Sequence, residues 1–162
     1  MSIKNIVCCT DFSENAEIAF QAAFEMAEKY QAKFTIIHAL PPVVNPLLTE
    51  TEWISPYEPI QSFVSKIEDR MQQEYGNRIS DSVDYEFVVL DGHVSTEILK
   101  YLEEHHTDLV VMGSYGLTGV GLVLFGSVAK RVAHKAPCSV MIVRTKEVDK
   151  IQTDEIKTTN QD

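Results

Sequence analysis

Residues 108–116 read Asp-Leu-Val-Val-Met-Gly-Ser-Tyr-Gly, and after nine further residues the chain continues with Gly126-Ser127. The run 108–112 is short, apolar and rich in β-branched side chains, which is typical of a buried strand. The segment from Ser127 to Lys135 is predicted to be a helix, so a glycine-framed loop joins the two. Glycine permits positive φ and close approach of the main chain to a ligand, and the free N–H groups of a helix N-terminus attract an anion. The stretch therefore predicts a phosphate-binding loop; the alternative is that its glycines only form turns.

This loop has neither of the two common phosphate-binding sequences. It lacks the Gly-Lys-Ser or Gly-Lys-Thr of a Walker A loop, and it does not follow the first strand as a Gly-x-Gly-x-x-Gly fingerprint would. The rest of the chain supplies the context, because apolar runs alternate with amphipathic segments from one end to the other. We predict strands at 3–10, 33–40, 83–90, 108–112 and 138–144, and helices at 13–30, 60–79, 94–106 and 127–135.

Strands that alternate with helices form a parallel sheet covered on both faces, because right-handed crossovers place helices over both sides. We therefore expect an α/β fold, a three-layer sandwich around five parallel strands. In the order 3-2-1-4-5 the winding reverses between the first and fourth strands, and ligands bind at the carboxyl ends of such strands. Asp11 and Gly113 follow these two strands, so the fold alone predicts a site there.

Length and charge narrow the class of protein. The 162 residues fit one domain, expected at 1–145, followed by a polar tail at 146–162 that we expect to be disordered. A net charge of -10 opposes contact with a phosphate backbone, so we expect no nucleic-acid partner. The chain shows no membrane-spanning run and no export signal, which predicts a cytoplasmic protein without a membrane partner.

Two further features have more than one interpretation. The segment 41–59 holds five of the six prolines, and we expect either a functional lid or an inert packed loop. Cys8, Cys9 and Cys138 are an odd number without a Cys-x-x-Cys pair, which favours buried packing over a redox or metal site. Cys8 and Cys9 are adjacent in a strand and should point to opposite faces of the sheet.

The spacing Gly113-x-x-Gly116, nine residues, Gly126-Ser127 resembles the ATP-binding signature of the universal stress protein family. The resemblance extends to Thr10-Asp11-Phe12-Ser13 after the first strand and to Ala136-Pro137-Cys138 before the last. It implies an adenine nucleotide alpha-hydrolase-like fold and a regulatory module of the stress response. The implied ligand is ATP, or AMP or ADP, with Mg²⁺ held through the phosphates and by no metal site of the protein itself.

The resemblance also implies roles for individual residues. The expected contacts are with ribose and phosphates (Thr10, Asp11), with the adenine edge through main chain (Ala39), with base and sugar (Met112, Gly113), and with phosphates (Gly116, Gly126, Ser127, Val128). Each residue also has a structural alternative. Asp11 and Ser127 would only cap helices, Met112 and Ala39 would only be core positions, and His38 is expected to be structural instead of a general base.

The chain departs from the family pattern at Leu117 and Leu122, where many relatives carry basic residues. The lost charge neutralisation leaves AMP, ADP or another adenylyl ligand as alternatives to ATP. The resemblance further implies a homodimer that pairs through the last strand at Val140, Met141, Ile142 and Val143. Two other functions stay open: a slow ATPase or phosphotransferase, for which only Asp11 and His38 are near enough and no catalytic residue is assigned, and a nucleotide-free dimeric scaffold.

Overall fold

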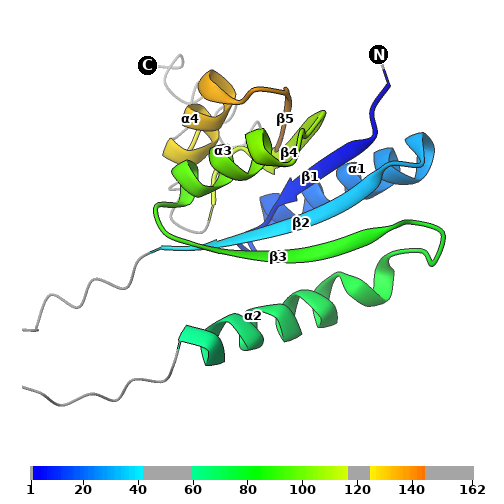
Figure 1. Ribbon diagram of the computed structural model, residues 1–162, viewed down its shortest axis with the longest axis horizontal. Coiled ribbons are helices and arrows are strands. Elements are labelled where there is room, and N and C mark those ends of the chain that lie inside the picture. The colour runs from blue at the N-terminus through cyan, green and yellow to red at the C-terminus, as the bar shows by residue number, and fades with distance from the viewer. Residues whose placement is uncertain (1, 42–59, 117–124, 145–162) are drawn as a thin grey trace, which may run out of the picture.

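The computed structural model describes residues 2–41, 60–116 and 125–144. Five parallel strands form one sheet in the order β3-β2-β1-β4-β5, as Figure 1 shows, which confirms the predicted topology. The strands are β1 (Asn5–Cys9), β2 (Lys33–Leu40), β3 (Tyr85–Asp91), β4 (Leu109–Gly113) and β5 (Ser139–Val143). The helices are α1 (Glu14–Tyr30), α2 (Ile60–Glu74), α3 (Val94–Glu104) and α4 (Ser127–Lys135), with a 3-10 turn at Gly76–Arg78.

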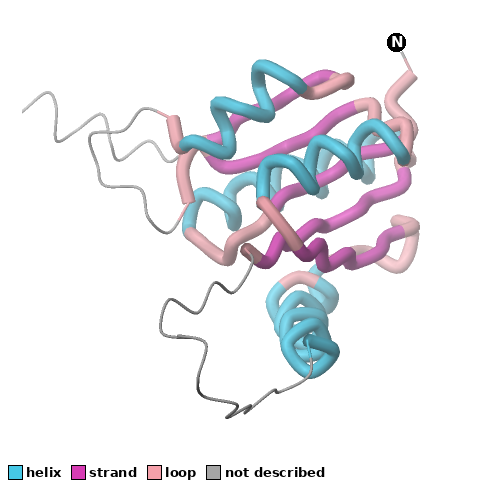
Figure 2. The backbone as a smooth tube through the Cα atoms, turned by 60° about the vertical axis from the view of Figure 1, so that its left-hand side comes forward, coloured by secondary structure: helices cyan, strands magenta, loops and turns pink. Residues whose placement is uncertain are grey.

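Helices cover both faces of the sheet and make the predicted three layers, as Figure 2 shows. Side chains of α1 and α2 share one buried cluster with alternate strand residues, and those of α3 and α4 share a second cluster on the opposite face. The central strands β1 and β4 are mostly apolar because both of their faces are buried. Cys8 lies in the first cluster and Cys9 in the second, as the alternation of a strand requires.

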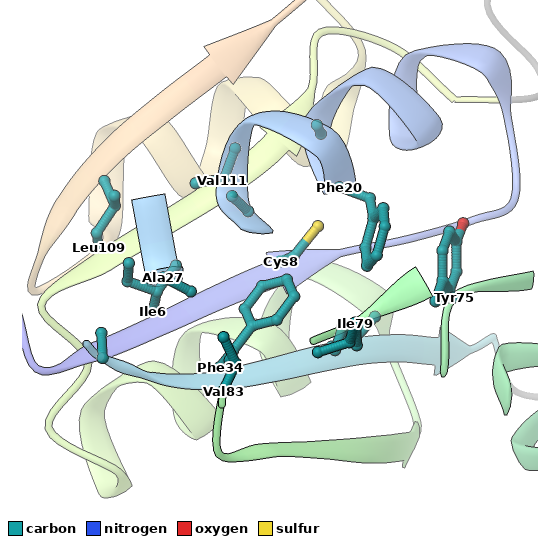
Figure 3. Close-up of a cluster of buried hydrophobic side chains, with 14 of the residues drawn as sticks. Ile6, Cys8, Phe20, Ala27, Phe34, Tyr75, Ile79, Val83, Leu109 and Val111 are labelled. Carbon is teal, nitrogen blue, oxygen red and sulfur yellow. The ribbon is translucent and has the colours of Figure 1, made fainter. Parts of the chain in front are cut away.

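The core beneath α1 and α2 is aromatic at the end of the sheet where the strands terminate. Figure 3 shows Phe20 beside Cys8 and Tyr75 on the other side of Phe20, and the rings of Phe20 and Tyr75 lie 4.5 Å apart between centroids. An ion pair on the surface joins α1 to the 3-10 turn that follows α2, since Arg78 Nη1 donates to Glu17 Oε2 at 2.9 Å. These contacts fix the segment after α2, Tyr75 and the 3-10 turn, against α1.

Some boundaries differ from the prediction. The helix predicted to reach residue 79 ends at Glu74, because Gly76 is a poor helix former and the chain tightens there into the 3-10 turn. The strand predicted from residue 83 begins at Tyr85, since a turn in which Val83 N donates to Ser80 O precedes it.

Three segments singled out in the sequence, namely 41–59 apart from Pro41, the tail 146–162, and the positions of Leu117 and Leu122, lie outside the described residues. Within the described ranges, no helix combines the length and the apolar character that crossing a membrane requires.

Candidate functional site

The turn after β1 and the loop after β4 meet at the carboxyl edge of the sheet, where the winding reverses. Asp11 is half-buried, and its Oδ1 accepts a hydrogen bond from Ser13 N at 3.1 Å. Gly116 lies so close to this side chain that a Cβ on the glycine would overlap Asp11 Oδ2. Ser13, and not Asp11, caps α1, because its hydroxyl accepts from Ala16 N at 3.2 Å. The helix-cap alternative for Asp11 is therefore wrong, and its carboxylate faces the glycine loop.

Close approach also explains Gly113. A Cβ on Gly113 would lie 2.8 Å from Asn15 Cβ, and Asn15 Nδ2 donates to Tyr115 O at 3.3 Å. Among the described glycines only Gly92 has a positive φ, so the glycines of the loop serve proximity and not unusual dihedrals. Sequence reasoning missed Asn15; the available signal was a single polar amide on a helix face whose other buried residues are apolar.

The base of the loop is closed by main-chain bonds. Ser114 N donates to Val143 O at 2.8 Å, and Ser114 O accepts from Gly126 N at 2.7 Å. The hydroxyl of Ser114 is fully buried and has no hydrogen-bond partner among the residues that the structure describes. On β4, Val110 and Met112 face α3 and α4 whereas Gly113 faces α1, so the alternation places Ser114 on the α4 side. Sequence reasoning did not single out this hydroxyl.

The N-terminus of α4 carries no side-chain cap. The cap residue is Gly126, Ser127 is the first helical residue, and the first turn contains no acidic side chain. The capping alternative for Ser127 is therefore wrong, because a residue inside the first turn does not occupy the cap position. The helix ladder begins with Lys130 N donating to Gly126 O at 3.0 Å, and the preceding N–H groups, including those of Ser127 and Val128, point out of the helix end.

Thr10 is bonded within the protein. Its hydroxyl lies 2.6 Å from Tyr75 Oη and accepts from Phe12 N at 3.0 Å, and its side chain is buried. Thr10 therefore fixes the turn that holds Asp11, and its hydroxyl lies on the α1–α2 side of the sheet. Tyr75 is a second residue that sequence reasoning missed, because no local pattern pairs two residues so distant in the chain.

His38 ends the hydrogen bonding between β1 and β2. The last bond of this ladder runs from Thr10 N to Ile37 O at 2.8 Å. The carbonyl of Thr10, just after β1, lies 2.9 Å from His38 Nδ1. The imidazole nitrogen must donate, because a carbonyl only accepts. In β2 the N–H and C=O groups of Ile37 and Ala39 point toward β1, because alternate residues of a parallel strand bond to the same neighbour. The main-chain groups of Ala39 therefore lie just beyond the last hydrogen bond between β1 and β2.

An unusual backbone conformation lies beside His38. Phe12 has φ 62°, in the left-handed region that bulky side chains rarely adopt. Its ring lies 4.9 Å from the His38 ring and 3.9 Å from Arg70 Cζ of α2. Burial lowers the pKa of His38 below its ordinary 6.5, the Arg70 charge lowers it further, and the bond to Thr10 and the Asp11 charge oppose both effects.

The chain matches the universal stress protein family over residues 2–144. It belongs to this family. A universal stress protein of Methanocaldococcus jannaschii is 33% identical over 146 residues, which cover 87% of this chain and 82% of that protein.

Solved universal stress proteins share the fold. UspA from Lactobacillus plantarum has a TM-score of 0.70 at 24% identity, covering 89% of this chain and 99% of that chain. A universal stress protein in complex with cAMP has a TM-score of 0.59 at 24% identity, covering 89% and 98%. One from Archaeoglobus fulgidus in complex with dAMP has a TM-score of 0.55 at 21% identity, covering 89% and 100%.

In this universal stress protein the predicted site residues form two groups. Asp11, Gly113 and Gly116 lie together, and Gly126, Ser127 and Val128 form the adjoining end of α4. Met112 is a buried core residue, and the Ala39 side chain packs against the same core beneath α3 and α4, so any contact of Ala39 with a ligand would use main chain. The described residues contain no group of three or more potential metal ligands.

Proposed function

We propose that this universal stress protein is a regulatory module that binds an adenine nucleotide, with ATP as the ligand. One observation carries the proposal: an uncapped helix N-terminus adjoins a serine whose buried hydroxyl has no partner in the described part of the chain. Ser114 adjoins the start of α4 through its main chain, since its carbonyl accepts from the cap residue Gly126 at 2.7 Å. A buried polar group without a partner costs about 1–3 kcal/mol. A phosphate would accept from all of these donors, and the helix dipole favours its charge.

The remaining groups fit the sugar and the base. Asp11 presents a carboxylate beside Gly116, which is an acceptor for ribose hydroxyls. The main chain of Ala39 offers one donor and one acceptor beyond the end of the β1–β2 ladder, a pair that matches the edge of adenine. Gly113 packs closely against Asn15 of α1, so only its main chain would line this edge of the sheet. The nucleotide would therefore run from Ala39 past Asp11 to Ser127.

Regulation by nucleotide fits a chain that offers little catalytic machinery. Phosphoryl transfer needs a positioned base or water-orienting group together with metal-bound phosphate. His38 Nδ1 is committed to Thr10 O, and Asp11 accepts from Ser13 N. We therefore assign the protein a role as a cytoplasmic sensor of nucleotide or energy state, with Mg²⁺ arriving through the phosphates.

We further propose a homodimer that pairs through β5. This strand is one edge of the sheet, and Met141 on it is 38% exposed. An exposed apolar edge strand is a template for pairing with a second chain, and a two-fold axis would satisfy both copies at once. The half-buried apolar residues Val140, Ile142 and Val143 would extend the interface.

Titration calorimetry with ATP and with AMP, with and without Mg²⁺, tests the proposal. The comparison is with a Gly126→Val, Ser127→Ala double variant. The Cβ atom alone of a side chain at position 126 would lie 3.3 Å from Tyr115 Cα, so a valine there would crowd the loop. We expect binding to the wild-type protein and a loss of at least about tenfold in the variant, equal to about 1.4 kcal/mol. Absence of binding to the wild-type protein would leave the nucleotide-free dimeric scaffold as the function.

A further inference from the structure

The first two turns of α4 carry cations where a helix ordinarily favours acids. Positive side chains near a helix N-terminus oppose its dipole. α1 follows the usual pattern, with a Ser13 cap and with Glu14 and Glu17 in its first turn. In α4 the first turn has no acid, and Lys130 and Arg131 follow directly. The two cations add positive charge to the positive end of the helix dipole, where negative charge would stabilise the helix.

Lys130 and Arg131 share a helix face with Ser127. They lie three and four residues after it, and all three are exposed. Helical side chains lean toward the N-terminus, so both cations extend toward the end of α4 where Ser127 begins. Neither residue forms an ion pair with another residue in the part of the chain that the structure describes. The same helix end adjoins Ser114, whose carbonyl accepts from Gly126 N and whose buried hydroxyl has no partner within the described ranges.

The charges near this helix end are otherwise unfavourable for a polyphosphate, so binding one would require cations from α4. The segment 117–124 contains no Lys or Arg, and the Asp11 carboxylate adjoins Gly116. The stretch from Phe125 to Arg144, in contrast, contains four Lys or Arg and no acidic residue, in a chain whose net charge is -10. Positive charge is therefore concentrated on α4 and at the end of β5.

We propose that Lys130 and Arg131 bind the outer phosphates of a nucleoside di- or triphosphate and replace the cations that the loop lacks. This inference rests on the proposed function and deepens it. The helix N-terminus and Ser114 receive the phosphate nearest the ribose, and the two cations act only on the phosphates beyond it. The pair thus sets the preference of the site for ATP over AMP.

The test is titration calorimetry of ATP, ADP and AMP with the wild-type protein and a Lys130→Gln, Arg131→Gln variant. Glutamine keeps the helix propensity and removes the charge. Lys135→Gln is the matched control, because it removes the same charge from the exposed last turn of the same helix. We expect ATP affinity to fall about tenfold or more in the double variant, with AMP affinity changed less than about twofold and the control near wild type for both.

Each outcome is decisive. Unchanged ATP affinity in the double variant overturns the inference, and so does an equal fall for AMP and ATP or an equal effect of Lys135→Gln. Binding of AMP by the wild-type protein separates the two claims, since it upholds the proposed function whatever the cations do. A wild-type protein that binds neither AMP nor ATP refutes both claims. Circular dichroism melting confirms that each variant is folded.

Discussion

Gly116 lies against the Asp11 carboxylate with no room for a Cβ between them. The contact joins the turn after β1 to the loop after β4, the two segments that meet where the sheet reverses its winding. The atom nearest to Gly116 is Oδ2, at the free end of the Asp11 side chain. A methyl group on residue 116 would therefore displace this carboxylate without disturbing the core. Function should therefore be more sensitive than stability to a change at this contact.

Gly116→Ala is expected to lower nucleotide affinity about tenfold, since the displaced carboxylate would lose its position beside the ribose. The melting temperature should change little, because both residues are only half-buried. Calorimetry on Gly116→Ala, Asp11→Ala and the double variant forms a double-mutant cycle. Strictly additive losses would contradict a direct effect of Gly116 on Asp11.

Tyr75→Phe is expected to reduce the free energy of unfolding by about 1 kcal/mol. The Tyr75 hydroxyl lies 2.6 Å from the buried Thr10 hydroxyl, which would be left with fewer partners. Urea denaturation measures the change. Tyr85→Phe is the matched control, since that half-buried hydroxyl makes no hydrogen bond within the described ranges; an equal loss in both variants would show that the Thr10 bond does not contribute.

His38 is expected to titrate below its ordinary pKa of 6.5, because burial and the charge of Arg70 disfavour its protonated form. The unfolded chain then binds the proton at higher pH than the folded one. The stability that neutral His38 contributes is complete above pH 6.5 and is lost as the pH falls through the lowered folded pKa. Wild-type protein should therefore lose more stability over this window than a His38→Gln variant.

Proton NMR titration of the His38 ring tests the electrostatic assignment. Arg70→Gln should raise the pKa of His38, since it removes a positive charge that faces the imidazole. Arg78→Gln is the control, because Arg78 pairs with Glu17 instead. The assignment fails if both variants leave the titration where it is in the wild-type protein.

Met141→Lys is expected to convert a homodimer into a monomer, because a charge on the β5 edge opposes pairing of two copies. Light scattering after size-exclusion chromatography measures the mass. Phe63→Lys on α2 is the control, since Phe63 is also exposed, at 50%, but lies away from that edge. A dimer that survives Met141→Lys and dissociates with Phe63→Lys would place the interface on α2.

The sequence was sufficient to predict the sheet order and the edge of the sheet where Asp11 and Gly113 lie. Strand and helix patterns alternate strictly, and right-handed crossovers leave few arrangements, so Asp11 and Gly113 could be assigned to one edge. Local boundaries were harder, because Ser13 and Asp11 are both good caps and only the turn geometry decides between them. The end of α2 depended on Gly76, whose effect on a helix varies with its context.

Contacts between distant residues were not predictable from a single sequence. The pairing of Tyr75 with Thr10 and of Asn15 with Tyr115 arises only after the sheet has brought their elements together. The left-handed conformation of Phe12 has no compositional signal, since such a conformation ordinarily favours glycine. The buried hydroxyl of Ser114 resembles any loop serine until its surroundings are known.

The central claim is that a nucleotide lies between Ala39, Asp11 and the N-terminus of α4. A titration of ¹⁵N-labelled protein with ATP, followed through assigned amide resonances, tests it most directly. We predict the largest shifts at the amides of Ala39, Gly113, Gly126, Ser127 and Val128, with little change at the amino ends of the strands. Saturable shifts confined to residues remote from this edge, or no shifts at millimolar ATP, would contradict it.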